Sequence, residues 1–289
     1  MKLALGTAQF GLKYGIANQQ GQVSHDEAKA ALALARAHGM DTLDTAIAYG
    51  DSEQRLGEIG IRDWRVVSKL PAIPEGCSDI AQWVVAAVRD SLGRLRVENL
   101  YGLLLHRPQQ LLEKNGDQLY RVLQRLKQDG LVQKIGISIY DPSELDNLCS
   151  SYQLDLVQAP FNIMDRRLID TGWLTRLAEQ GTELNVRSVF LQGLLLMAEN
   201  DRPPKFDRWA PLWSEWHVWL GDTSLTSLQA CLRYALSFSE ISRVIVGVDS
   251  FNQLNEILQA AQGPAPQTRD ALKTDDPDLL NPARWAILT

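Results

Sequence analysis

Cysteine is scarce in this chain. The 289 residues include three, Cys77, Cys149 and Cys231, and no two of them form a CxxC pair. Such an odd, widely spaced set argues against a disulfide framework and against a structural zinc site, and we expect no bound metal. It is also typical of proteins that stay in a reducing compartment, so we expect the cytoplasm.

Long apolar runs and an excess of positive charge are missing as well. No stretch approaches the roughly 20 apolar residues that a membrane helix needs, and the run in residues 1–6 is too short for a secretion signal. The net charge is −6, and the 29 Lys and Arg residues are scattered along the chain. We therefore expect neither a membrane nor a nucleic acid as partner.

The sequence does contain a regular alternation of short apolar segments with longer segments of helical period. Eight strand–helix units predict parallel strands closed into one (β/α)8 TIM barrel spanning residues 1–289, with 263–289 as a tail. An open, doubly wound sheet is the rival fold, but its GxGxxG fingerprint does not occur in the chain. The expected strands are Leu3–Gly6, Met40–Asp44, Trp64–Leu70, Asn99–Leu105, Lys134–Ser138, Asp155–Gln158, Glu183–Val189 and Arg243–Gly247.

Two local patterns add detail to this barrel. Ser24 followed by Glu27 predicts a helix that begins with a capping box. Residues 191–222 form an insertion after the seventh strand, with Trp209, Trp213, Trp216 and Trp219 at spacings that place them on one helical stripe. We expect this stripe to pack on the barrel. The alternative is that it forms a wall of the substrate pocket.

Polar residues stand at the carboxyl ends of three consecutive predicted strands. Asp44 ends the second strand, Lys69 lies at the end of the third, and His106 follows the fourth, while Tyr49 lies in the loop after Asp44. Each residue alone has an ordinary structural explanation, such as a helix cap or a solvated strand end. In a barrel, however, these strand ends meet at one mouth, which predicts a shared site.

The chemistry that suits this set is proton donation. A free phenol is a weak acid at neutral pH, and a nearby lysine cation favours its ionised form, so Lys69 is expected to lower the pKa of Tyr49. Asp44 would keep the ammonium charged and oriented. His106 would orient a carbonyl oxygen and hydrogen-bond to the charge that builds there.

In this order, the four residues resemble the catalytic tetrad of the aldo-keto reductases. The resemblance runs from Leu5 to about Ala261, and it includes GTAQFG at residues 6–11 and LDTAIAYG at residues 43–50. It implies a monomer that reduces a small aldehyde or ketone with a nicotinamide cofactor. Tyr49 would then be the proton donor.

The resemblance also implies a set of cofactor-binding residues. Ser138 and Gln158 match positions that hold the nicotinamide carboxamide. Further matches lie at the first, second and seventh strands, namely Gly6, Thr7, Asp44, Arg187, Ser188 and Val189. The loop after the eighth strand matches the family's adenosine-phosphate site, with Gly247, Asp249, Gln253 and Glu256.

Three positions depart from the family pattern. Ile139 replaces the usual Asn, and Arg187 replaces the aromatic residue that commonly stacks on the nicotinamide. Gln253 stands where an Arg is common, so the usual clamp for the 2′-phosphate of NADP is not evident. We expect NADPH on family habit, with NADH as the possible alternative.

Two other functions use the same residues differently. Lys69 could be a Schiff-base nucleophile of an aldolase-like barrel, a reading that leaves the spacing of Asp44 and Tyr49 unexplained. Alternatively, the protein could be a sensor that binds a nicotinamide cofactor with little turnover, since Ile139 and Arg187 are unusual.

Overall fold

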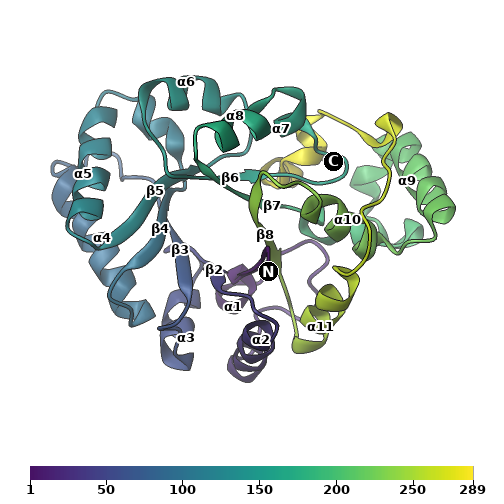
Figure 1. Ribbon diagram of the computed structural model, residues 1–289, viewed down its shortest axis with the longest axis horizontal. Coiled ribbons are helices and arrows are strands. Elements are labelled where there is room, and N and C mark those ends of the chain that lie inside the picture. The colour runs from purple at the N-terminus through teal and green to yellow at the C-terminus, as the bar shows by residue number, and fades with distance from the viewer. Residues whose placement is uncertain (289) are drawn as a thin grey trace.

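The computed structural model describes residues 1–288 and contains eight parallel strands closed into a barrel (Figure 1). Each strand pairs with the next one along the chain, and β8 pairs with β1. The predicted (β/α)8 barrel is therefore confirmed. The strands are β1 Leu3–Gly6, β2 Thr42–Asp44, β3 Arg65–Leu70, β4 Leu100–Leu105, β5 Val132–Ser138, β6 Leu156–Pro160, β7 Glu183–Arg187 and β8 Ile241–Gly247.

Helices surround the ring of strands (Figure 1). Within residues 1–288, none combines the length and the apolar character needed to cross a bilayer. The α-helices are α1 Ala8–Gly11, α2 His25–Ala37, α3 Ser52–Ile59, α4 Ile80–Leu95, α5 Gly116–Gln128, α6 Glu144–Ser151, α7 Arg167–Asp170, α8 Trp173–Glu179, α9 Ala210–Thr223, α10 Ser227–Leu236, α11 Phe251–Ala260 and α12 Pro277–Leu280. The 3₁₀ helices are η1 Pro108–Leu112, η2 Leu191–Leu196, η3 Glu199–Asp201, η4 Pro204–Trp209, η5 Asp270–Leu272 and η6 Pro282–Ile287.

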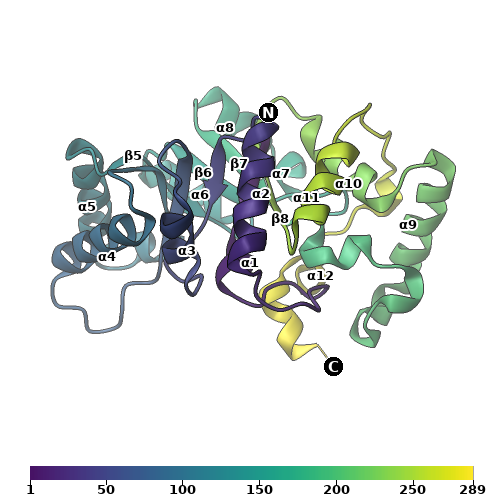
Figure 2. The same ribbon diagram turned by 90° about the horizontal axis from the view of Figure 1, so that it is seen from below.

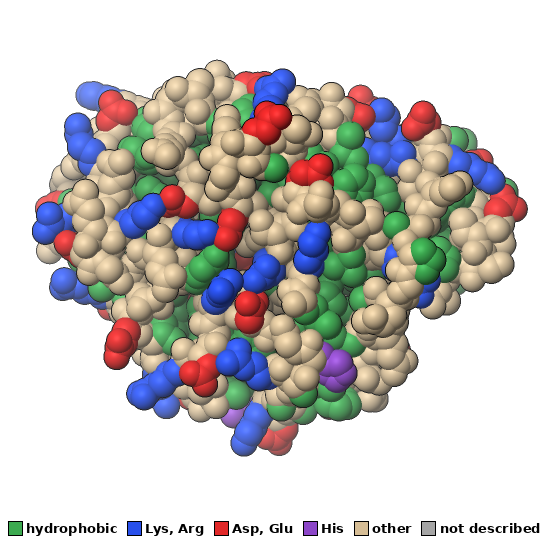
Figure 3. Space-filling view, viewed as in Figure 1, with side chains coloured by type: hydrophobic (Ala, Val, Ile, Leu, Met, Phe, Trp, Pro, Cys, Tyr) green, Lys and Arg blue, Asp and Glu red, His purple; other side chains and the backbone are tan. Residues whose placement is uncertain are grey.

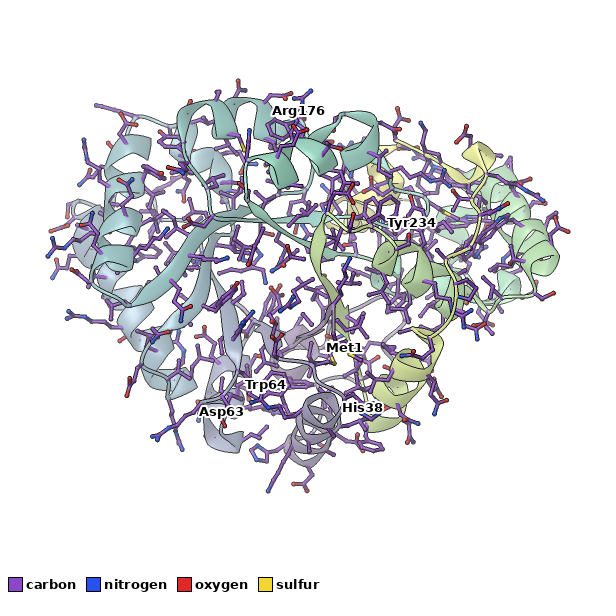
Figure 4. All side chains as sticks on the ribbon, viewed as in Figure 1. Met1, His38, Asp63, Trp64, Arg176 and Tyr234 are labelled. Atoms are coloured by element: carbon purple, nitrogen blue, oxygen red, sulfur yellow. The ribbon has the colours of Figure 1, made fainter. Side chains whose placement is uncertain are left out.

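The interior of the barrel is a packed core. Val67, Leu104 and Leu156 form a small apolar cluster of their own, and side chains fill the ring that looks open in a ribbon drawing (Figure 4). Gly136 on β5 has to be a glycine, because a Cβ there would lie 1.7 Å from the carbonyl oxygen of Leu156. The ring is therefore not a channel, and a ligand has to bind at its mouth.

Charged side chains of both signs cover the surface. Asp41 pairs with Arg243 at 3.1 Å, and Lys134 pairs with Glu183 at 2.5 Å. In a view along the barrel axis, Lys and Arg are interspersed with Asp and Glu instead of gathered in one patch (Figure 3). Each of these pairs joins two different segments of the barrel.

The tryptophan stripe is buried in the same apolar core as the barrel, as expected, and it packs against the tail as well. Helix α9 lies at the outer edge of the molecule, beside the C-terminal segment (Figures 1 and 2). Trp219 Nε1 donates to the carbonyl oxygen of Gln267, and Trp209 Nε1 donates to Asp276 Oδ2. The stripe thus packs against the tail. These contacts join residues that are far apart in the chain, so a helical pattern alone does not predict them. None of the four tryptophans lines the cleft at the barrel mouth.

Glu53 connects α3 to β3 and α4. Its carboxylate is 2% exposed and accepts hydrogen bonds from Ser68 Oγ (2.7 Å), Ser91 Oγ (2.6 Å) and the Arg94 guanidinium (2.7 and 2.9 Å). Gly57 allows this close approach, because a Cβ there would lie 2.0 Å from the Arg94 carbonyl oxygen. The network fixes the helix that follows the Tyr49 loop.

Replacing Glu53 with Ala leaves the Arg94 guanidinium and two serine hydroxyls without their partner. We expect the free energy of unfolding to fall by about 1–3 kcal/mol, measured by urea denaturation followed by far-UV circular dichroism. The matched control is Glu58→Ala on the same helix, at an exposed position, which should change stability by less than about 0.5 kcal/mol. Equal effects of the two substitutions would contradict the role given to Glu53.

Candidate active site

Asp44, Lys69 and His106 all lie at the carboxyl ends of strands, as predicted. Asp44 is the last residue of β2, Lys69 is the penultimate residue of β3, and His106 directly follows β4. Their register is fixed by the barrel, in which Asp44 lies beside Val67 and Lys69 beside Leu104. The structure thus brings the three side chains to one mouth.

A buried ion pair joins two of them. Lys69 is 1% exposed, and its Nζ donates to Asp44 Oδ2 at 2.7 Å and to the carbonyl oxygen of Thr45 at 2.9 Å. Gln158 Nε2 donates to the other carboxylate oxygen of Asp44. Burial lowers the pKa of Lys69, and the Asp44 carboxylate acts in the opposite direction. The pairing expected between Asp44 and Lys69 is therefore present.

Tyr49 and His106 lie next to this pair. Lys69 Nζ is 5.0 Å from the centre of the Tyr49 ring. The rings of Tyr49 and His106 meet edge to face, with their centres 6.1 Å apart. The loop after β2 therefore carries Tyr49 back over the ends of β3 and β4, so that the phenol, the imidazole and the ion pair form one cluster.

The electrostatics of Tyr49 differ from our expectation. Burial raises the pKa of the phenol, the Asp44 carboxylate raises it further, and the opposing cation is Arg187. The net pKa is thus raised and not lowered as predicted, because burial and the Asp44 carboxylate outweigh the nearby cations. The phenol is protonated at neutral pH.

His106 is neutral at pH 7. Burial is the main cause, and the cations of Lys69 and Arg187 act in the same direction, so the pKa of the imidazole falls to about 4. A neutral imidazole next to a phenol offers one N–H donor to a bound oxygen atom.

A cleft runs from this cluster along β1, β7 and β8 to the first turns of α11. Most of the residues predicted to bind the cofactor line it, namely Gly6, Thr7, Asp44, Arg187, Ser188, Val189, Gly247, Asp249, Gln253 and Glu256. Ser138 and Gln158 lie beneath it instead: both are buried, and Ser138 Oγ donates to Gln158 Oε1 at 3.3 Å. Gln158 is hydrogen-bonded to Asp44, and Ser138 is connected to Asp44 through Gln158.

Arg187 lines the end of the cleft that lies at the catalytic cluster. Its Nη2 donates to the carbonyl oxygen of Ile139 at 2.8 Å, and its guanidinium carbon is 4.5 Å from the centre of the Tyr140 ring. One face of the guanidinium is thus covered by an aromatic ring that sequence reasoning missed. Nothing in the local sequence around Tyr140 signals a contact with the end of β7.

Residues 14–18 bridge the cleft through contacts that the sequence does not predict. Asn18 Nδ2 donates to Asp249 Oδ1 at 3.0 Å, and the Tyr14 hydroxyl accepts from Gln192 Nε2 at 3.2 Å. The segment therefore reaches both the loop after β8 and the loop after β7. The only local signal is glycine at the turns, since Gly15 has a φ of +100°.

The backbone after β7 is strained where it lines the cleft. Ser188, Leu191 and Gln192 have φ values of +61°, +48° and +53°, which side chains other than glycine rarely adopt. This left-handed turn ends β7 at Arg187, two residues earlier than predicted. Such strain costs about 1–3 kcal/mol per residue and is typical of ligand-binding segments.

The cleft suits an elongated organic ligand. Its glycines leave room at the strand ends: a Cβ at Gly247 would lie 2.7 Å from the side-chain amide of Gln9. Across residues 1–288, no three His, Cys, Asp or Glu side chains meet as metal ligands. The chemistry present is a protonated phenol, a neutral imidazole and a buried ion pair at the closed end of a long cleft.

Comparison with curated proteins gives two relatives that cover most of the chain. It is 28% identical over 270 residues to L-galactose dehydrogenase from Arabidopsis thaliana, which covers 83% of this chain and 79% of that protein. It is 25% identical over 246 residues to the uncharacterized oxidoreductase YqkF from Bacillus subtilis (strain 168), which covers 77% and 78%.

Solved structures share the fold. The aldo-keto reductase AKR11C1 from Bacillus halodurans (holo form) has a TM-score of 0.72 at 21% identity, over 92% of this chain and 88% of that chain. The glycerol dehydrogenase AKR11B4 from Gluconobacter oxydans has a TM-score of 0.68 over the same shares, also at 21% identity.

The model of the Aldo/keto reductase family matches residues 2–269, which is nearly the whole chain. The resemblance carried by Asp44, Tyr49, Lys69 and His106 thus agrees with a match across the barrel. The chain belongs to the aldo/keto reductase family.

Proposed function

We propose that this chain reduces an aldehyde or ketone to an alcohol, with hydride from a reduced nicotinamide dinucleotide. The observation that carries the proposal is the buried pair of Lys69 and Asp44 next to Tyr49 and His106, at one end of a long cleft. Family membership supports the coarser statement that the protein is an oxidoreductase that uses NAD(P)H.

The residues at the catalytic end fit the nicotinamide part of such a cofactor. The Gln158 amide is hydrogen-bonded to Asp44, and the Ser138 hydroxyl donates to Gln158. We assign both residues to the nicotinamide carboxamide. Thr7 and Ser188 line the same cleft as Asp44. When bound, the reduced nicotinamide supplies the hydride that adds to the carbonyl carbon.

Tyr49 supplies the proton. Its raised pKa keeps the hydroxyl protonated at neutral pH, so the phenol can donate to the carbonyl oxygen as that atom gains charge. The oxygen receives the proton and becomes the alcohol hydroxyl, and Tyr49 is left as a phenolate. The neutral imidazole of His106 hydrogen-bonds to the same oxygen and holds it near the phenol.

Lys69 acts on the phenolate that the proton transfer creates. Its ammonium lies 5.0 Å from the ring centre, and Asp44 keeps it charged and in place. A cation at this distance stabilises a phenolate more than it affects a neutral phenol. By stabilising the phenolate, Lys69 makes the proton transfer more favourable than it would be without the ammonium. This effect opposes burial and Asp44, which keep the pKa of Tyr49 raised overall.

The substrate is a small carbonyl compound that fits between Tyr49 and the polar rim of the cleft. Gln9, Tyr14 and Gln192 place amide and hydroxyl groups there, which suits a polyhydroxylated aldehyde or ketone. The curated relative L-galactose dehydrogenase has a sugar in its name. Aldoses and short hydroxylated aldehydes are therefore the first compounds to screen.

The geometry favours this reaction over the alternatives. A Schiff-base nucleophile has to be an accessible amine, whereas Lys69 is 1% exposed and bonded to both Asp44 and Thr45. A sensor without turnover has no need of a protonated phenol and an imidazole beside the cleft. Three unpaired cysteines agree with a reducing cytoplasm, and we propose that the protein works there as a monomer.

Tyr49→Phe removes the proton donor and leaves the ring in place. We expect kcat to fall by about 10²–10⁴-fold, while the Kd for the dinucleotide stays unchanged, measured by steady-state assays and isothermal titration calorimetry. Tyr120→Phe is the matched control, because that hydroxyl bonds to Gln153 on the outside of the barrel, and it should keep full activity. Full turnover in Tyr49→Phe would contradict the proposal, and tight binding without turnover by the wild type would favour a sensor.

The raised pKa of Tyr49 predicts opposite pH profiles for the two directions of the reaction. Reduction needs the protonated phenol, so its kcat should change by less than about twofold between pH 7 and 9. Alcohol oxidation needs the phenolate, so its kcat should rise by up to about tenfold per pH unit over the same range. A reduction rate that falls steeply above pH 7 would show that the phenol ionises in this window.

His106 should make stability depend on pH. In the unfolded chain a histidine binds a proton near pH 6.5, whereas the folded site binds it only near pH 4. The free energy of unfolding should therefore fall, as pH drops from 6.5 to 4, by up to about 1.4 kcal/mol per unit from this residue. Urea denaturation should show a shallower slope in His106→Asn, and the same slope as wild type in His38→Asn, whose side chain is exposed. Equal slopes in all three proteins would contradict this prediction.

A further inference from the structure

The two ends of the cleft carry opposite charge. Arg187 lines the catalytic end, whereas Asp249 and Glu256 line the far end, at α11. Among the described residues that line the cleft, Arg187 is the single Lys or Arg. The far end is therefore an acidic surface with no cation to balance it.

The first turn of α11 is already occupied by groups of the protein. Glu27 Oε2 accepts from the backbone N–H of Phe251 at 2.7 Å, and Ser250 Oγ accepts from that of Gln253. The N–H of Asp249 donates to Gln253 Oε1 at 2.8 Å. A helix N-terminus ordinarily attracts anions, but here a carboxylate from α2 takes that position. Glu27 thus does not complete the capping box predicted for α2, although Ser24 does cap that helix.

The position of the adenosine part follows from the proposed function. The nicotinamide has to lie at Tyr49, because the phenol and the hydride act on the same carbonyl group. A dinucleotide is elongated, and the cleft continues from Tyr49 to Glu256. The adenosine ribose consequently lies at the far end, among the carboxylates.

A 2′-phosphate and a 2′-hydroxyl make opposite demands on this end. The phosphate carries about −1.5 to −2 charges at pH 7 and is stabilised by Arg or Lys. The hydroxyl can donate a hydrogen bond to a carboxylate, which is how acidic residues recognise the ribose of NAD in other folds. Carboxylates therefore repel the 2′-phosphate and bind the 2′-hydroxyl.

We infer that the acidic far end, formed by Asp249 and Glu256 and supported by Glu27 at the first turn of α11, selects the dinucleotide without a 2′-phosphate, so that the cofactor is NADH instead of the NADPH expected from the resemblance. This inference rests on the proposed function. Glu256 lines the wall of the cleft, where it would face the adenosine ribose. Glu27 acts through the first turn of α11, whose N–H it withholds from an anion.

Calorimetric titration of the whole protein with NADH and with NADPH tests the selection without any turnover. We expect wild type to bind NADH at least about tenfold more tightly. Glu256→Arg replaces a repelling charge with an attracting one and should shift the ratio by at least about tenfold toward NADPH. Gln259→Arg is the control, since it adds a cation to an exposed position of the same helix that does not line the cleft, and it should leave the ratio within about twofold of wild type.

Two further measurements keep the outcome decisive. Glu27→Ala removes the acceptor of the Phe251 N–H and should also shift the ratio toward NADPH. It provides the test if Glu256→Arg does not fold by circular dichroism. The preference for NADH should shrink as salt is raised, because charge repulsion is screened. Equal or tighter binding of NADPH by wild type would overturn this inference and leave the proposed function standing. Failure of both dinucleotides to bind would instead overturn the proposed function itself.

Discussion

One ion pair organises the functional end of this barrel. Lys69 can be buried among apolar strands only because Asp44 lies 2.7 Å away, since an unpaired ammonium at 1% exposure would be strongly destabilising. The pair in turn depends on the closure of the sheet, which places the ends of β2 and β3 side by side. The chemistry of the site therefore depends directly on the closure of the barrel.

The ion pair also explains how two neighbouring groups stay neutral. Burial keeps the phenol of Tyr49 protonated, and the Asp44 carboxylate of the pair raises its pKa further. His106 is kept neutral by burial and by nearby cations. The site thus holds a proton ready at the phenol oxygen, and a cation close enough to stabilise the charge left behind.

Much of this could be predicted from the sequence, because it follows from local patterns. The alternation of apolar and helical segments gave the eight strands, and the polar residues at strand ends gave Asp44, Lys69 and His106. What could not be predicted depends on pairs far apart in the chain. Glu27 accepts a hydrogen bond from Phe251, which is 224 positions away in the chain. Arg187, at the end of β7, lies over the ring of Tyr140 in the loop after β5. The prediction for the pKa of Tyr49 was wrong for a related reason, because that pKa depends on the exact distance between Asp44 and Lys69.

The tryptophan-rich segment has a practical consequence for spectroscopy. Five of the eight tryptophans lie in η4, α9 and η6, in the lobe that α9 forms with the tail, namely Trp209, Trp213, Trp216, Trp219 and Trp285. Ultraviolet emission of the protein therefore reports mainly on this lobe, whereas backbone ellipticity reports on the whole barrel. If the lobe detaches first on heating, the two signals will trace separate transitions, and an emission melt alone will record the loosening of an appendage instead of the loss of the catalytic scaffold.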